Sequence, residues 1–170
     1  MKTKAGGKSK SAALNIRIRT MRKSDLPFIH QSVAETNWQD IPPTLKKFAK
    51  RDKCDKRVIE EFTSFVKTRK YKFKVYVAEY NNVPVGYISI GELKSHIIDQ
   101  PFGAFLDFWV EPKYRKKGIG NQLFDCAAKE LLVRGYNHWG LMVAASNKAS
   151  LHMCKKKGFS FDYLGMSRQL

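Results

Sequence analysis

The chain is short of cysteine, of acidic residues and of long hydrophobic runs. Its three cysteines, Cys54, Cys126 and Cys154, are far apart and include no Cys-x-x-Cys pair, which argues against a disulfide framework and against a zinc site. No apolar stretch approaches the length of a membrane span, and no apolar segment of the kind found in a secretory signal follows the first lysines. These absences predict a cytoplasmic protein that holds no metal and does not enter a membrane.

Acidic residues are outnumbered by basic ones. Asp and Glu total 15 against 32 Lys and Arg, which gives a formal net charge of +17 in 170 residues. Such a charge attracts polyanions, among them nucleic acid, ribosomal RNA and acidic lipid, as well as small anionic ligands. Between Pro42 and Lys72, eleven basic residues stand against four acidic ones. This segment has two interpretations, the solvated face of a helix or a surface for polyanions.

Two regions of the chain differ in composition. In residues 1–13, lysines lie among Gly, Ser and Ala with no apolar periodicity, which is typical of a flexible basic arm. Residues 14–170 carry periodic apolar patterns and contain no long linker. They are therefore expected to form one folded domain with a single core.

The apolar periodicity predicts strands and helices in alternation. The expected strands are 15–19, 71–80, 83–93, 103–110, 137–143 and 159–166, and the expected helices are 25–36, 42–69, 118–134 and 146–157. Asn81 and Asn82 tolerate positive φ and are expected to join two antiparallel strands in a tight hairpin. This order predicts an α/β fold with a mixed, mostly antiparallel central sheet and helices on both faces.

A glycine-rich loop follows the strand expected at 103–110. Gly118 and Gly120 let backbone N–H groups turn toward an anion, and the helix that begins there presents the positive end of its dipole to the same point. Three neighbouring cations add positive charge. The residues expected to bind a phosphate group are Arg115, Lys116, Lys117, Gly118, Ile119, Gly120 and Asn121.

A second motif lies at the start of the helix expected over 146–157. Asn147 is followed by Ser150 three positions on, and by Gly158 and Phe159 eleven and twelve positions on. Together the two motifs resemble those of the GNAT acyltransferases, and the resemblance covers about residues 14–170. It implies the GNAT fold, acetyl-CoA (coenzyme A) as the coenzyme, and transfer of an acetyl group to an amine.

The resemblance also implies where acetyl-CoA binds. The glycine loop holds its pyrophosphate, and main-chain groups of Phe108, Trp109 and Val110 pair with its pantetheine arm and direct an N–H at the thioester carbonyl. Asn147 and Ser150 are expected to contact the coenzyme. Asn147 is equally suited to capping its helix, and Phe108 and Trp109 are equally suited to core packing.

The chain departs from the family at both residues that commonly move protons. Many relatives have a tyrosine that protonates the departing thiolate, where this chain has Cys154; relatives that acetylate ribosomal proteins have a glutamate base, where it has Met142. Cys154 is the candidate acid, with Tyr163 as an alternative. The candidate bases are Glu35, which is the first choice, and Asp40, Glu92 and Asp107.

Three functions fit these patterns. The first is an acetyl-CoA-dependent N-acetyltransferase whose acceptor is a protein N-terminal α-amine or a lysine, held near ribosomal RNA by nonspecific contacts of its basic surface. The second is an enzyme that acetylates a small amine such as a polyamine or an aminoglycoside. The third is a non-catalytic acyl-CoA-binding module, which the loss of the usual Tyr and Glu favours. A monomer and a homodimer are both compatible with the sequence.

Overall fold

The computed structural model describes residues 14–94, 100–162 and 165–166, so the predicted basic arm, residues 1–13, lies outside it. The described residues form one sheet in the order β1-β2-β3-β4-β5. The strands are Arg17–Thr20, Lys74–Tyr80, Val83–Leu93, Phe102–Val110 and Trp139–Leu141. The first three pairings are antiparallel, and β4 pairs with β5 in parallel. The predicted mixed, mostly antiparallel sheet is therefore confirmed.

The helices also follow the predicted order, with one division. They are α1 (Leu26–Asp40), α2 (Pro43–Lys46), α3 (Arg51–Thr68), α4 (Ile119–Val133) and α5 (Lys148–Lys156), with 3₁₀ turns at Lys23–Asp25, Lys70–Lys72 and Pro112–Tyr114. The single helical region expected over 42–69 is thus two helices, because residues 47–50 leave the helical conformation. No helix in the described part of the chain is both long and apolar enough to cross a membrane.

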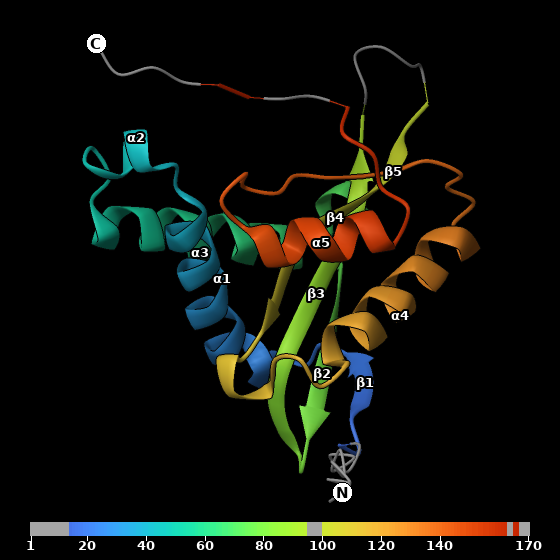
Figure 1. Cartoon of the computed structure of the whole chain (residues 1–170). Coiled ribbons are helices and arrows are strands. Elements are labelled where there is room, and N and C mark those ends of the chain that lie inside the picture. Colours follow the sequence, from blue (N-terminus) through green and yellow to red (C-terminus); the bar gives the residue numbers. More distant parts are fainter. Residues whose placement is uncertain (1–13, 95–99, 163–164, 167–170) are drawn as a thin grey trace, which may run out of the picture.

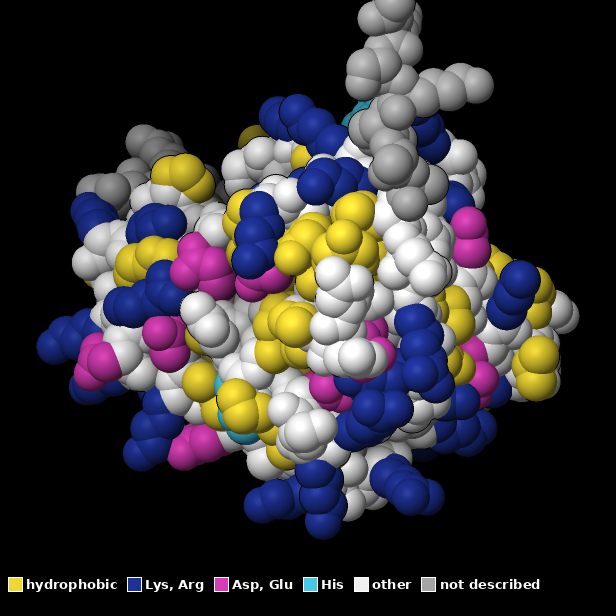
Figure 2. Space-filling model, turned by 90° about the horizontal axis from the view of Figure 1, so that it is seen from below, with side chains coloured by type: hydrophobic (Ala, Val, Ile, Leu, Met, Phe, Trp, Pro, Cys, Tyr) yellow, Lys and Arg dark blue, Asp and Glu magenta, His cyan; other side chains and the backbone are white. Residues whose placement is uncertain are grey.

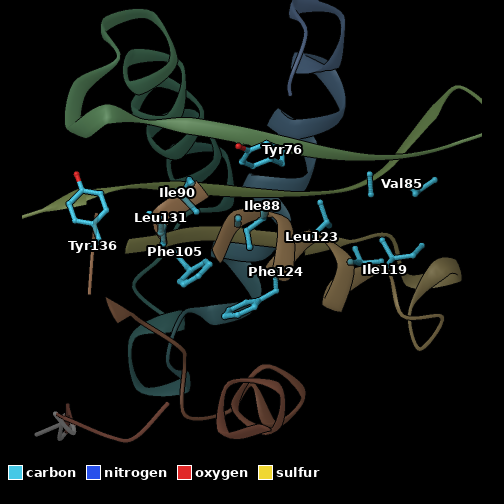
Figure 3. Packing of buried hydrophobic residues seen from close by; sticks show 13 residues of the cluster. Tyr76, Val85, Ile88, Ile90, Phe105, Ile119, Leu123, Phe124, Leu131 and Tyr136 are labelled. Carbon is cyan, nitrogen blue, oxygen red and sulfur yellow. The ribbon is translucent and has the colours of Figure 1, made fainter. Parts of the chain in front are cut away.

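Helices cover both faces of the sheet, as predicted. On one face α1 and α3 pack on the strands through a buried cluster: Ile29, Val33, Phe62, Val75, Val77, Tyr87 and Trp109. On the other face α4 packs through a larger cluster that includes Ile88, Phe105, Leu123 and Phe124 (Figure 3). Within this cluster the Phe105 and Phe124 rings are stacked. Figure 1 shows α5 crossing in front of the sheet, between α1 and α4.

One predicted hairpin is confirmed and one predicted strand is wrong. Asn81 and Asn82 have φ of 49° and 62° and join β2 to β3 in a tight turn. The strand expected over 159–166 is absent from residues 159–162 and 165–166, which have no regular structure. Instead, the Phe159 ring packs edge-on against Phe105 and Phe124, each 6.0 Å away between ring centres. Phe159, which suggested a strand, is therefore partly buried against α4 and β4 from a loop.

Candidate active site

β4 and β5 separate midway along β4. Their parallel pairing covers only residues 103–105 of β4 and 139–141 of β5. Directly after Phe105 the register of β4 against β3 shifts, so that Leu106 is an extra residue in a β-bulge. A bulge bends its strand and re-aims the side chains that follow. From the bulge to Val110, β4 has no neighbouring strand on its β5 side within the described residues.

Two adjoining cavities occupy the space that this separation opens. One, of about 510 Å³, extends from β4 to the loop before α4, and the other, of about 400 Å³, lies between β4 and residues 141–144. Six residues line both cavities: Thr36, Asp40, Phe108, Asn147, Ser150 and Met153. Because their walls are shared, the two cavities are parts of one feature, which we call the β4–β5 groove.

The backbone of β4 presents hydrogen-bonding groups to the groove. On the other edge of β4, Glu111 donates its N–H to the Val85 carbonyl at 2.9 Å. Because an antiparallel ladder alternates, the N–H and C=O groups of Phe108 and Val110 point to the opposite, β5 side. The Val110 carbonyl accepts a hydrogen bond from Arg115 Nε at 2.8 Å. The groups left for a ligand are the N–H groups of Phe108 and Val110 and the carbonyl of Phe108.

The loop before α4 ends in a candidate anion site at the helix N-terminus. Gly118 is the N-cap, with φ of 81°, a left-handed conformation that suits glycine. The Gln122 N–H donates to the Gly118 carbonyl at 3.2 Å, so the N–H groups of residues 119–121 point out of the helix end. Together with the helix dipole, these amides give the end of α4 the character of a phosphate site.

Gly120 allows close packing of α4, in addition to leaving the backbone amides accessible to a ligand. A Cβ at this position would come within 2.9 Å of Phe108 Cζ. Glycine therefore allows the first turn of α4 to lie against the Phe108 ring, which lines both cavities. A larger residue at position 120 would displace this ring into the groove.

The three cations of the loop have different environments. Arg115 is bound to the Val110 carbonyl, and its guanidinium lies 4.6 Å from the centre of the Trp109 ring. Lys117 Nζ lies 5.5 Å from the centre of the Tyr114 ring, and Lys116 is exposed with φ of 60°. Arg115 thus orients the loop on β4, whereas the two lysines supply charge beside the anion site.

Asn147 connects α5 to α1 across the groove. Its Oδ1 accepts the Ser150 N–H at 3.1 Å, which caps α5. Its Nδ2 donates to Asp40 Oδ1 at 3.4 Å. The capping alternative is therefore observed, and the predicted contact of Asn147 and Ser150 with a coenzyme fits their position on the groove wall.

Two of the four candidate bases line the groove. Asp107 lies on β4 directly after the bulge, and burial, reinforced by the negative charges of Glu61 and Asp40, raises its pKa to about 6. Asp40, at the end of α1, lines both cavities, and burial raises its pKa as well. A carboxylate whose pKa is raised toward neutrality is suited to accept a proton.

The other two candidate bases are held in ion pairs outside the groove. Glu35, the first choice from sequence, accepts from Arg51 at 2.9 Å and from Gln39 at 2.6 Å, and the hydrogen bond from Arg51 holds its pKa below the ordinary value. Glu92 pairs with Lys72 at 2.7 Å, which lowers its pKa in the same way. Neither residue is part of the lining of either cavity.

The positions where the chain departs from the family also lie on the groove. Cys154 is buried in the wall of the smaller cavity, and burial raises the pKa of its thiol. Met142, in the place of a glutamate, lines the same cavity and is 97% exposed. Tyr163, the alternative acid, lies outside the described residues.

Sequence reasoning missed Thr36 and Met153, which line both cavities. For Met153, helical spacing is a usable signal, because it lies three residues after Ser150 on the helix expected over 146–157. Thr36 shares a helix face with Asp40 only because α1 continues to Asp40, beyond the end expected at residue 36.

Comparison with known proteins identifies the family of proteins to which this chain belongs. Residues 31–159 match the acetyltransferase (GNAT) family, and the chain belongs to that family. No curated protein matched the chain. The protein is thus an acetyl-CoA-dependent N-acetyltransferase, and the predicted family, fold and coenzyme are confirmed.

Solved structures of the same fold include acetyltransferases of different kinds. A putative acetyltransferase from Pyrococcus furiosus is 19% identical, with a TM-score of 0.75 over 92% of this chain and 100% of that one. A ribosomal-protein-alanine N-acetyltransferase from Brucella melitensis is 14% identical, with a TM-score of 0.63 over 91% and 99%. The aminoglycoside N-acetyltransferase AAC(6')-Iy, solved in complex with CoA, is 17% identical, with a TM-score of 0.62 over 91% and 95%. At these identities the similarity concerns the fold and leaves the acceptor open.

Proposed function

We propose that this enzyme transfers the acetyl group of acetyl-CoA to a primary amine of a polypeptide, either an N-terminal α-amine or a lysine side chain. The observation that carries the proposal is the composition of the groove. Its smaller cavity has two carboxylates, Asp40 and Asp107, in a wall that is otherwise largely apolar, including Ile88, Leu106 and Leu141. Such a wall accommodates one ammonium group, because the two carboxylates compensate a single buried charge. The apolar residues of the wall favour an acceptor that is uncharged next to its amine.

The edge of the groove supports a peptide acceptor. Met142 is almost fully exposed and lines the smaller cavity. An exposed apolar side chain beside a binding groove offers a contact to the residue that carries the amine. We therefore assign the space along residues 141–144 to the acceptor.

The coenzyme is assigned to the other part of the groove. We place its pyrophosphate on the N–H groups of residues 119–121, beside Lys116 and Lys117. Its pantetheine arm lies along the β5 side of β4, where the N–H groups of Phe108 and Val110 are directed. The coenzyme supplies the thioester, and an N–H of β4 stabilises the oxyanion that forms when the amine attacks.

A small amine is the second candidate acceptor. The charge of Glu61 acts on Asp107 together with that of Asp40, so three carboxylates contribute to the potential at this end of the groove. A polyamine would benefit from that potential. However, an aminoglycoside brings several cations to a protein of net charge +17, and the groove offers few partners for them.

We propose in addition that the basic surface makes nonspecific contacts with RNA. Figure 2 shows Lys and Arg side chains spread over a whole face of the molecule, with smaller groups of Asp and Glu among them. On α3, Lys53, Lys56 and Arg57 are exposed. Contacts of this kind come from phosphate neutralisation, so they weaken steeply as salt rises.

The acceptor is tested by measuring release of the coenzyme thiol with four amines at equal concentration. These are a peptide with a free N-terminus and no lysine, an N-terminally blocked peptide with one lysine, spermidine, and an aminoglycoside. We expect a peptide to give the highest kcat/KM and to gain the mass of one acetyl group. A kcat/KM about tenfold higher for spermidine or the aminoglycoside would assign the enzyme to small amines.

A further inference from the structure

The acetyltransferase reaction requires an acceptor for protons, and the structure offers a specific one. An ammonium acceptor loses two protons on becoming an amide: one before its nitrogen attacks the thioester carbon, and one as the C–N bond is completed. One proton ends on the departing coenzyme sulfur when the C–S bond breaks, and the other reaches solvent. A group beside the attack point must take the first proton, because only the neutral amine is a nucleophile.

We propose that Asp107 is the base that takes this proton. Asp107 directly precedes Phe108, whose backbone faces the groove, and Asp107 is one of the residues that line the smaller cavity. The bulge at Leu106 places Asp107 on the same face of β4 as Trp109. The N–H of Asp107 is held by Ser89 Oγ at 2.9 Å. This bond fixes the backbone of Asp107 relative to β3, so the carboxylate has a defined position at the point where β4 leaves β5.

The surroundings of Asp107 support the role. Among the described residues, the negative charges that act on it are those of Asp40 from α1 and Glu61 from α3. Tyr87 from β3 lies within the field of Asp107, and Cys154 from α5 lines the same cavity. None of these groups is cationic, so no partner in the described part of the chain keeps the Asp107 carboxylate permanently ionised. By contrast, Glu35 and Glu92 both have cationic partners that stabilise the charged form.

Two orphan donors on the α1–α3 side of the sheet mark a place for water. Tyr87 OH and Trp109 Nε1 are buried and have no hydrogen-bond partner among the described residues. Their residues are paired across β3 and β4, and Trp109 is two residues from Asp107 on the same face of β4. Because a buried unpaired donor costs about 1–3 kcal/mol, water is expected at both atoms.

Asp40 is the alternative base, and its contacts favour a role in attracting the substrate instead. It accepts a hydrogen bond from Asn147, which also caps α5, so it connects two walls of the groove. We expect Asp40 to attract the ammonium and Asp107 to deprotonate it. As pH falls through the Asp107 pKa of about 6, an increasing fraction of the carboxylate is protonated and cannot accept a proton, so kcat/KM should fall on the acid side.

The test compares Asp107→Asn with Asp125→Asn. Asp125 is an exposed carboxylate on α4, paired with Lys157, and its variant controls for the loss of one negative charge. We expect Asp107→Asn to lower kcat by about a hundredfold or more, to remove the acid limb, and to leave CoA affinity unchanged by calorimetry. Asp125→Asn should behave as the parent enzyme. The proposal would be overturned if Asp107→Asn kept kcat within threefold of the parent. It would also be overturned if kcat/KM still fell at low pH, or if the variant changed only the KM for the amine.

Two further measurements do not depend on the Asp107→Asn protein. A carboxyl NMR titration of the enzyme without coenzyme should give Asp107 a pKa near 6. Glu61→Gln removes a like charge and should move both this pKa and the acid limb of kcat/KM to lower pH. An Asp107 pKa of ordinary value, or an acid limb that Glu61→Gln leaves in place while the NMR pKa moves, would exclude Asp107 as the base.

Discussion

Cys154 has the position of a proton donor but the properties of a packing residue. Its thiol is buried in the groove wall, and burial raises its pKa, so it holds its proton at neutral pH. A tyrosine hydroxyl has an ordinary pKa of about 10, so acidity alone does not separate Cys154 from the family's tyrosine. We infer a packing role for Cys154 from its burial in a largely apolar wall.

We predict that Cys154→Ala retains turnover within about tenfold of the parent, because positioning and the oxyanion contact carry most of the rate. Steady-state kinetics with saturating acetyl-CoA measure this, and thermal unfolding checks that the smaller side chain leaves the fold intact. A loss of about a hundredfold in kcat at unchanged KM would instead identify Cys154 as the donor.

The sequence indicates the groove residues with local spacing more clearly than the contacts between distant residues. The glycine loop and Asn147 can be found because their spacing is local. Glu35 is the first-choice base from its place near the end of the first helix, but the sequence does not show that Arg51, sixteen residues away, pairs with it. In the same way, the burial of Asp107 depends on packing of α1 and α3 over β4, and the bond from Arg115 to Val110 depends on how the loop turns.

At the scale of elements, α4 offers a matched pair of glycines. Gly118 at its N-cap and Gly135 just beyond its C-terminus have φ of 81° and 82°, and an added Cβ would meet nothing within 4 Å at either position. Alanine at each should therefore destabilise the fold by a similar amount, about 1 kcal/mol. Only at Gly118 does the added methyl group project beside the amides that we assign to the pyrophosphate.

We predict that Gly118→Ala weakens CoA binding about tenfold and that Gly135→Ala leaves it unchanged. Isothermal calorimetry gives the two affinities, and thermal unfolding checks that both variants lose similar stability. Equal affinities in the two variants would remove the pyrophosphate from the end of α4.

Elements with a strong local pattern were predicted, and those set by distant contacts were not. The β2–β3 hairpin follows from Asn81-Asn82 between two alternating runs, and β4 and α4 follow from the glycine loop that joins them. The strand expected over 159–166 is absent from the described residues of that range, where Phe159 packs edge-on against the stacked rings of Phe105 and Phe124 instead of extending the sheet. The gap between β4 and β5, which opens the groove, is implied by the family resemblance at residues 108–110 but has no local sequence signature of its own, because it depends on where the β5 pairing ends.

In the described part of the molecule, the sheet has one stretch, the second half of β4, that lacks a neighbouring strand on its β5 side. β2, β3 and the first half of β4 pair continuously beneath helices on both faces, whereas the second half of β4 leaves backbone groups directed into a groove. The charge of the chain, +17, draws an anionic coenzyme to this groove from any direction. We propose that the coenzyme completes the sheet by lying along the β5 side of the second half of β4.

Residue-resolved amide hydrogen exchange, measured by NMR with and without CoA, tests this claim most directly. The N–H groups of Phe108 and Val110 point to the groove, and those of Trp109 and Glu111 point to β3. We predict that CoA slows exchange at Phe108 and Val110 and at residues 119–121, with little change at Trp109 and Glu111, which are already paired in the sheet. CoA binding that leaves Phe108 and Val110 unprotected would contradict the placement of the coenzyme on β4.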